Sequence, residues 1–183
     1  MASNPIKAVG SVSGNQPRVA SQPEAATQTF LRGTPVQLNA TAPGGVEAWD
    51  GVTIGNGIAG ISVNDASNLV TQGTPKTLTF GSVINEPSAV NIPRGAPLND
   101  GNMLVEVAAP DSVFSAQVGP AQLAATAVVG HNYGLTIDTD NHWFVDLTID
   151  NQPTSVVQLV GIDANDVRGV RFVFIDEVAQ IVA

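Results

Sequence analysis

The sequence contains no cysteine, and this absence removes several kinds of chemistry at once. Disulfide bonds, thiolate nucleophiles and cysteine-based metal sites are excluded, and the redox compartment cannot be read from the chain. Aromatic residues are also few, with two tryptophans, one tyrosine and six phenylalanines among 183 residues. Because 43% of the residues are nevertheless hydrophobic, most of them alanine and valine, we expect a core of small and β-branched side chains.

Positive charge is scarce and dispersed. Seven Lys and Arg residues face sixteen Asp and Glu residues, which gives a net charge of −9. The basic residues are scattered along the chain: Lys7, Arg18, Arg32, Lys76, Arg94, Arg168 and Arg171. An acidic chain without a basic cluster repels phosphate backbones, so we expect no nucleic-acid partner.

Long apolar runs are missing as well. The first 30 residues lack the continuous apolar core of a signal peptide, and no stretch has the length and hydrophobicity of a membrane span. No amphipathic helix or basic stripe indicates a membrane surface. We therefore expect a soluble protein that is not exported by that route and has no membrane partner.

The sequence instead has short apolar runs separated by glycine and proline. Val36 and Leu38 alternate with polar neighbours, as do Leu78 and Phe80, and this period of two is typical of β-strands. Residues 120–129, PAQLAATAVV, favour a helix of no more than two turns, because a threonine and two valines weaken it. The fold class predicted is all-β.

The composition divides the chain into an arm and two modules. Residues 1–29 are rich in Ser, Pro, Gln and Ala without an apolar period, which indicates an extended N-terminal arm, or alternatively a disordered tail. Residues 30–100 form a first β module that ends in a Pro/Gly-rich connection at 86–102, and residues 101–183 form a second. We expect two small antiparallel modules, barrel or sandwich-like, with a boundary near Asp100.

The stretch HNYGLTIDTDNHWFVDLTID, residues 131–150, contains both histidines and the only tyrosine. Tyr133 and Leu135 alternate with smaller or polar residues, as do Trp143 and Val145, and DTDN between them supplies turn formers. This pattern predicts a β-hairpin, with Tyr133, Trp143 and Phe144 in the core and interface of the second module.

The same hairpin contains the residue types that metal binding or catalysis would use. Asp138, Asp140 and His142 have the spacing of the first ligands of a calcium loop, but the glycine and glutamate that such a loop requires later are absent. A hydrolase would pair His131 or His142 with a serine, yet the sequence has no G-x-S-x-G elbow. We therefore predict no catalytic residue, no metal and no cofactor, and expect that the protein is not an enzyme.

The motif GNGIAG, residues 55–60, fits the dinucleotide pattern G-x-G-x-x-G literally. It lies among predicted strands and lacks the long helix whose N-terminus would hold a pyrophosphate. We interpret Gly55, Gly57 and Gly60 as turn glycines.

Several motifs resemble the capsid decoration proteins of tailed bacteriophages, also called cement or head-stabilising proteins. FLRGTPVQL resembles the opening strand of that family, and GIAGISVNDA followed by QGTPKTLTFGSV resembles two further strands. VGHNYGLTIDTDNHWFVDLT and the later GVRFVF are similar to a module of phage head structural proteins. The resemblance covers most of residues 30–183.

The resemblance implies a structural virion protein, made in the host cytoplasm, that binds the outer capsid surface. Its partners would be the major capsid protein and further copies of itself, as a homotrimer more often than a dimer, and it would cement neighbouring capsid subunits. The capsid or oligomer contacts we predict are Pro5, Ile6, Val9, Val12, Val19, Phe30, Tyr133 and Trp143. The alternative is a carbohydrate- or receptor-binding β module of a phage tail or fibre.

Overall fold

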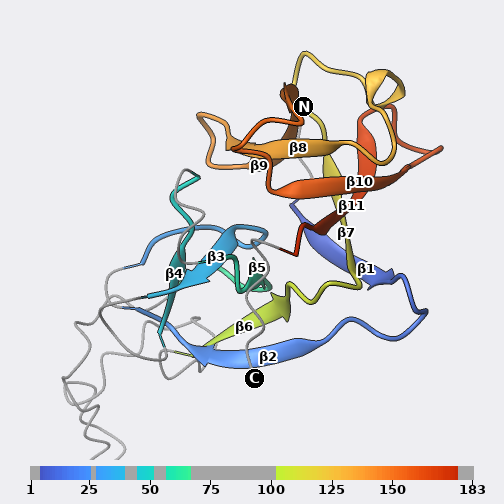
Figure 1. The fold of residues 1–183 in the computed structure, drawn as a ribbon. Helices are drawn as coiled ribbons and strands as arrows, with labels where there is room; N and C mark the ends of the chain where they lie inside the picture. The colour runs from blue at the N-terminus through green and yellow to red at the C-terminus, as the bar shows by residue number, and fades with distance from the viewer. Residues whose placement is uncertain (1–4, 26–27, 40–44, 52–56, 67–101, 177–183) are drawn as a thin grey trace, which may run out of the picture.

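The computed structural model describes residues 5–25, 28–39, 45–51, 57–66 and 102–176. Within these ranges the chain forms strands β1 to β11 and one 3-10 turn, η2 (Ala124–Thr126), so the all-β prediction is confirmed (Figure 1). The short helix predicted within residues 120–129 is this single turn. The predicted strand around Leu78 and Phe80, and the predicted connection up to residue 101, lie outside the described residues.

The larger sheet has six strands, and every neighbouring pair is antiparallel. Their order is β1 (Lys7–Ser11), β7 (Ser112–Gln117), β11 (Gly169–Phe174), β10 (Val157–Ile162), β8 (Asn132–Ile137) and β9 (Trp143–Asp150). Strands β8 and β9 are the hairpin predicted for residues 131–150, and Ile137 pairs with Trp143 next to its turn.

The smaller sheet has five antiparallel strands. Their order is β2 (Val19–Pro23), β6 (Asn102–Val107), β5 (Gly60–Ser62), β3 (Pro35–Leu38) and β4 (Val46–Ala48). Strand β3 is the strand predicted around Val36 and Leu38. Val36 is buried in the core inside this sheet, and partly buried Leu38 packs against it.

Each sheet closes on itself at an isolated parallel bridge, the smaller one from β2 to β4 and the larger one from β7 to β9, which leaves β1 as an edge strand. In the smaller sheet Glu24, just after β2, pairs with Val46 of β4, and the Ala25 N–H donates to the Val46 carbonyl at 2.8 Å. In the larger sheet Val118, just after β7, pairs with Val145 of β9. This closure satisfies backbone groups that an open edge would leave unpaired, and it gives each sheet a barrel-like form.

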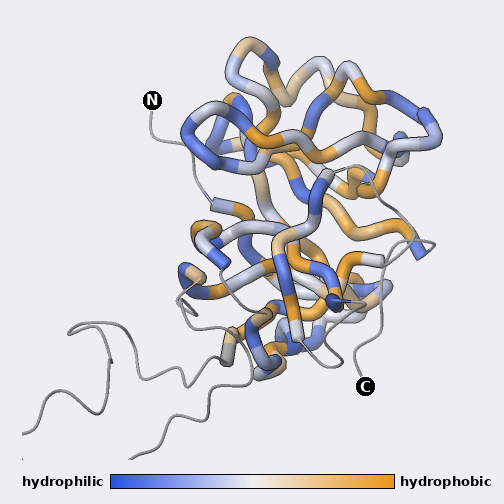
Figure 2. Tube along the Cα trace, turned by 90° about the vertical axis from the view of Figure 1, so that its left-hand side faces the viewer, coloured by the Kyte–Doolittle hydropathy of each residue, from blue (hydrophilic) through white to orange (hydrophobic). Residues whose placement is uncertain are grey.

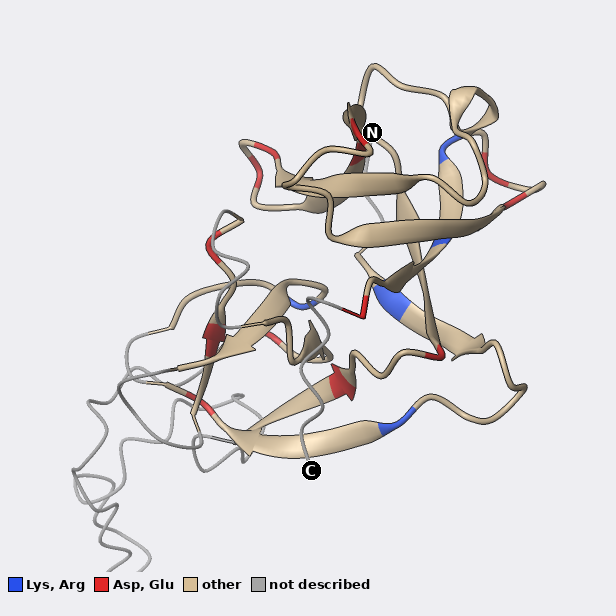
Figure 3. Ribbon diagram, viewed as in Figure 1, with Lys and Arg blue, Asp and Glu red and all other residues tan. Residues whose placement is uncertain are grey.

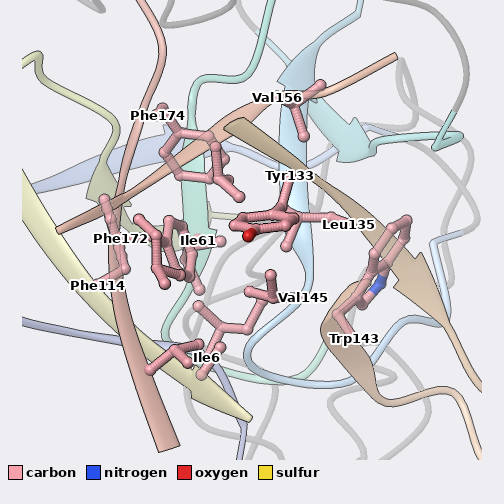
Figure 4. Close-up of a cluster of buried hydrophobic side chains, with 14 of the residues drawn as sticks. Ile6, Ile61, Phe114, Tyr133, Leu135, Trp143, Val145, Val156, Phe172 and Phe174 are labelled. Carbon is pink, nitrogen blue, oxygen red and sulfur yellow. The ribbon is translucent and has the colours of Figure 1, made fainter. Parts of the chain in front are cut away.

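The larger hydrophobic core draws side chains from both sheets. It contains a group of three phenylalanine rings, Phe114, Phe172 and Phe174, with centroids 5.2 to 5.7 Å apart (Figure 4). Trp49, Ile58 and Ile61 enter the same core from the smaller sheet and its loops. Apolar and polar stretches alternate along the trace through both sheets (Figure 2). The two sheets therefore pack against each other through a shared apolar interior.

The N-terminal residues are extended, but they are not an arm separate from the modules. Strand β1 pairs with β7 of the larger sheet, and β2 pairs with β6 of the smaller one. Ile6 is 2% exposed in the larger core. Composition alone did not indicate this arrangement, because the partners of these strands lie about a hundred residues further along the chain.

The boundary predicted near Asp100 does not divide the two sheets. Strand β6 begins at Asn102, in the predicted second module, yet it lies between β2 and β5 in the smaller sheet. The chain passes to the larger sheet only between Val107 and Ser112. The physical reason is again long-range pairing. Strand β6 pairs with β2 and β5, which both precede it in the chain.

Gly60 is a strand residue and not a turn glycine. It lies in β5, where a Cβ atom would be 2.1 Å from the carbonyl oxygen of Glu106 on β6. Gly57 does have the positive φ of a turn, at 67°, whereas Gly55 lies outside the described residues. Gly60 is therefore required by the close approach of β5 and β6.

Candidate functional site

Three of the eight predicted contact residues are buried in the larger core. Ile6 and Tyr133 are each 2% exposed and Trp143 is 6% exposed. The Tyr133 hydroxyl also accepts a hydrogen bond from the Val128 N–H at 3.0 Å. Ile6, Tyr133 and Trp143 are therefore not available to a partner in this structure. The core prediction is confirmed for Tyr133 and Trp143, whereas Phe144, predicted with them, is only half-buried.

The other predicted contact residues lie nearer the surface. Val9, Val12 and Val19 are 46%, 70% and 51% exposed, all on the N-terminal segment that runs from β1 to β2. Pro5 is half-buried, and half-buried Phe30 packs against the smaller core. The three valines, called the N-terminal valines below, are therefore the predicted contacts with the greatest exposure.

A second exposed apolar surface lies at the end of the larger sheet that contains the β10–β11 turn. Its six aliphatic side chains are between 38% and 77% exposed: Leu123, Val128, Val129, Val160, Ile162 and Val167. The Ala124 N–H donates to the Val167 carbonyl at 3.0 Å, and the Gly130 N–H donates to the Leu159 carbonyl at 2.8 Å, so the three segments lie together. We call this surface the valine-rich end. Sequence reasoning missed it, because residues 127–129 were interpreted as part of a helix.

The turn beneath Val167 is held in one conformation by polar contacts. The Asp166 carboxylate accepts hydrogen bonds from Gln117 Nε2 at 2.8 Å and from the Arg168 N–H at 2.9 Å. The bond from Gln117 is the main reason that the pKa of Asp166 lies below its ordinary value. Arg168 in turn donates to the Val118 carbonyl at 2.6 Å. The valine-rich end is therefore presented by a fixed backbone.

A network of side chains supports the closure of the larger sheet. Gln122 Oε1 accepts hydrogen bonds from the backbone N–H groups of Gly119 and Leu147, each at 3.1 Å, and its Nε2 donates to Asp146. Burial raises the pKa of Asp146, but hydrogen bonds from Thr148, Gln122 and Thr136 together hold it below its ordinary value. Gln122 thus joins the segment after β7 to β9.

The turn between β8 and β9 contains the group that resembles a metal site. Asp138, Asp140 and His142 each offer one ligand atom, and these atoms lie within 4.8 Å of one another. One Asp138 oxygen, however, accepts the backbone N–H groups of Asp140 and His142, each at 2.9 Å. Asn141 completes the turn with a φ of 63°. The Asp138 carboxylate therefore has a structural role in closing the turn.

Glu106 connects the two sheets at the point where β1 crosses. Its carboxylate, on β6 of the smaller sheet, accepts the backbone N–H of Ala8 on β1 of the larger sheet. Burial raises the pKa of Glu106 above its ordinary value of 4.5, although the Ala8 bond and the charge of Lys7 act in the opposite direction. This contact lies beside the bulge between Ala8 and Gly10 in β1.

A cavity of about 350 Å³ lies between the two sheets. Its lining combines residues around β4, among them Trp49 and Asp50, with residues of the β8–β9 hairpin, among them Ile137, Asn141 and Trp143. The indole Nε1 of Trp143 is buried and has no hydrogen-bond partner among the described residues. A volume of this size is at the lower end of the range for small-molecule pockets.

Comparisons with known proteins find no matching family, no similar curated protein and no similar solved structure for this chain. In the described part of the chain, no helix has the length and hydrophobicity needed to cross a membrane. The basic residues of that part do not gather on one surface (Figure 3).

Proposed function

We propose that this protein binds the outer surface of an assembled phage capsid as a homo-oligomer and cements neighbouring major capsid subunits. Its role is structural and not enzymatic. The phage assignment is supported by the resemblance of FLRGTPVQL, GIAGISVNDA and the 131–150 hairpin to decoration proteins. The observation that carries the binding role is the presence of two separate exposed apolar surfaces on one body.

A protein that ties neighbours together needs more than one contact surface. Val12 donates its N–H to Asp111, just before β7, whereas the valine-rich end begins after Val118, beyond the other end of β7. The N-terminal valines and the valine-rich end therefore lie toward opposite ends of this strand. Exposed apolar groups of this kind mark protein-binding surfaces when they gather, and each surface would contact a different subunit.

An oligomer strengthens attachment to a shell. When several copies are linked, each further contact forms at a high effective concentration, so contacts that are weak individually hold the assembly in place. The acidic charge of −9 favours a capsid patch that bears Lys and Arg, and at physiological salt it acts mainly on the rate of encounter. Of the two oligomers that the resemblance implies, we propose the trimer.

The test is co-sedimentation with undecorated phage shells, after light scattering has given the solution mass of the free protein. We expect a trimer that sediments with the shells at a fixed ratio to the major capsid protein. The double variant Val12→Asp and Val167→Asp places a charge on both surfaces and is expected to abolish sedimentation. Val63→Asp, at a residue just after β5 that is 39% exposed, is the matched control and is expected to bind normally.

Two results would contradict the proposal. One is a wild-type protein that stays in the supernatant with every shell tested. The other is a double variant that keeps its fold by circular dichroism and still sediments at the wild-type ratio.

A further inference from the structure

The two closed sheets share one topology. Strands β2 to β6 form the smaller sheet in the order β2-β6-β5-β3-β4, and β7 to β11 form the larger one in the order β7-β11-β10-β8-β9, with β1 added outside. Numbered along the chain, both orders read first, fifth, fourth, second, third. In each, the parallel bridge joins the residue just after the first strand to the third strand. We call β2 to β6 the first unit and β7 to β11 the second unit.

The registers of the two units agree as well as their strand orders. A slip of one residue at any strand contact would turn the side chains to the opposite face and break this agreement. Bulges interrupt it only beyond Tyr133 in the β8–β9 pair and beyond Leu159 in the β10–β11 pair. One set of equivalent residues satisfies every strand contact: Glu24 and Val118, Val36 and Tyr133, Leu38 and Leu135, Val46 and Val145, Gly60 and Val157, and Val105 and Phe172.

The loop that enters the second strand of each unit also has the same geometry. Gly33 and Gly130 are equivalent, and both have a positive φ, of 82° and 93°. The Gly33 N–H donates to the Ser62 carbonyl at 2.8 Å, and the Gly130 N–H donates to the Leu159 carbonyl at 2.8 Å. Ser62 and Leu159 are themselves equivalent in the strand registers. Strand order, register and this loop together indicate a repeated structural unit.

The surface beside the repeated glycine differs between the units. Immediately before the glycine, the first unit has Arg32, whereas the second unit has Val129, which is 54% exposed. Since Arg32 occupies the equivalent place, the unit does not need an exposed aliphatic side chain there to fold. The valine-rich end is thus an apolar extension, in the second unit, of two aliphatic positions that both units have: Leu31 and Val128, and Val63 and Val160.

Charge indicates the partner that the valine-rich end fits. The chain has a net charge of −9, so two copies repel each other wherever acidic faces meet. None of the six side chains of the valine-rich end is charged, and in the turn that carries Val167 the charge of Arg168 opposes that of Asp166. Asp163 is the other charged residue of that turn. An aliphatic surface gives a basic capsid patch nothing to pair with, whereas it can meet the same surface of another copy with little repulsion.

We propose that the chain is a tandem duplication of one barrel-like unit, and that the valine-rich end of the second unit is the contact between copies of the protein. In the homo-oligomer the valine-rich ends of neighbouring copies meet, and the N-terminal valines remain free for the capsid. This inference rests on the proposed function, because it names the surface that forms the proposed oligomer.

The duplication supplies a matched pair of variants. Val63 and Val160 follow the equivalent residues Ser62 and Leu159, and they are 39% and 38% exposed. Light scattering of the purified full chain, without shells, gives the mass of each variant. Val160→Asp is expected to lower the mass from that of a trimer to that of a monomer, because it buries carboxylates in an apolar contact. Val63→Asp places the same charge on the first unit and should leave the trimer intact.

A second variant transfers a residue from one unit to the other. Val129→Arg gives the second unit the side chain that the first unit has at the equivalent position. We expect the variant to keep its fold, as measured by circular dichroism, and to be monomeric by light scattering. This variant decides the matter even if Val160→Asp does not fold.

Four results overturn the inference. They are a monomeric wild type, a folded Val160→Asp or Val129→Arg variant that stays trimeric, a Val63→Asp variant that dissociates as Val160→Asp does, and a Val129→Arg variant that fails to fold. Shell sedimentation is measured separately. A trimer that ignores shells contradicts the capsid proposal alone, and surface variants that stay trimeric contradict this inference alone.

Discussion

The indole rings of Trp49 and Trp143 lie 5.5 Å apart with their planes inclined by 33°, and this contact joins the two sheets. Trp49 follows β4 of the smaller sheet, and Trp143 begins β9 of the larger one. Both belong to the larger core, with 3% and 6% exposure. A substitution at either ring therefore affects the packing of one sheet on the other.

We expect Trp143→Ala to lower the free energy of unfolding by about 3 to 5 kcal/mol, because it removes a large buried ring and leaves Trp49 without its neighbour. Urea unfolding followed by circular dichroism measures this. Val167→Ala, at a side chain that is 77% exposed, is the control and should change stability by less than about 0.5 kcal/mol. A loss below about 1 kcal/mol in Trp143→Ala would show that the ring contact contributes little.

The N-terminal segment is expected to be part of the folded body. Ile6→Ala removes a core side chain that is 2% exposed and should cost about 2 to 5 kcal/mol in urea unfolding. Val9→Ala, three residues away and 46% exposed, should cost less than about 1 kcal/mol. Equal, small effects at both positions would mean that β1 does not hold the larger core together in solution.

Gly60 provides a test of the close approach between β5 and β6. In Gly60→Ala the new Cβ atom would lie 2.1 Å from the Glu106 carbonyl oxygen, so the strands must separate, and we expect a loss of about 1 to 3 kcal/mol or more. Gly10→Ala, in β1, meets no atom within 4 Å and should leave the melting temperature nearly unchanged. Similar melting temperatures for the two variants would contradict the observed packing.

The raised pKa of Glu106 predicts a particular dependence of folding stability on pH. Its pKa is raised above 4.5 in the folded chain, mainly by burial, so just above that pH the folded state keeps a proton that the unfolded state has lost. The stabilising contribution of this group is complete below pH 4.5 and is lost as the pH rises through the folded-state pKa. Ionised Glu106 thus stabilises the folded state less than a neutral group at the same position would.

Glu106→Gln removes this titration and keeps a side-chain oxygen that accepts the Ala8 N–H. Relative to the wild type, the variant should therefore gain stability as the pH rises from about 4 to 7. Urea unfolding of both proteins across this range gives the difference, in which the contributions of the other acidic groups cancel. A difference that is constant, or that falls with pH, is the result that would refute the prediction.

Local pattern was enough to predict several elements. The alternation around Val36 predicts β3, and the alternation on either side of DTDN predicts β8 and β9 with their turn at Asp138 to Asn141. These elements are visible in the sequence because strand alternation and turn chemistry depend on residues only a few positions apart. The same short-range patterns placed Tyr133 and Trp143 in the core.

The candidate sites could not be predicted from short-range sequence patterns of this kind. The valine-rich end combines residues 123–129, 160–162 and 167, and the cavity combines residues near β4 with the β8–β9 turn. Neither grouping has a signal in the sequence, because its members meet only when distant strands pair. Of the predicted contacts, the N-terminal valines are exposed and Ile6 is buried, and the composition of that segment does not distinguish them.

The sequence by itself determined the all-β class, the absence of thiol chemistry and the 131–150 hairpin, because each follows from composition or from neighbours along the chain. Only the tertiary structure decided that β1 and β2 belong to different sheets, that β6 pairs with strands of the first half, and that Trp49 meets Trp143. The physical reason is that strands far apart in the sequence pair so as to bury their apolar faces and satisfy their backbone hydrogen-bonding groups. Which faces and groups are still exposed once the local elements have formed depends on the whole chain.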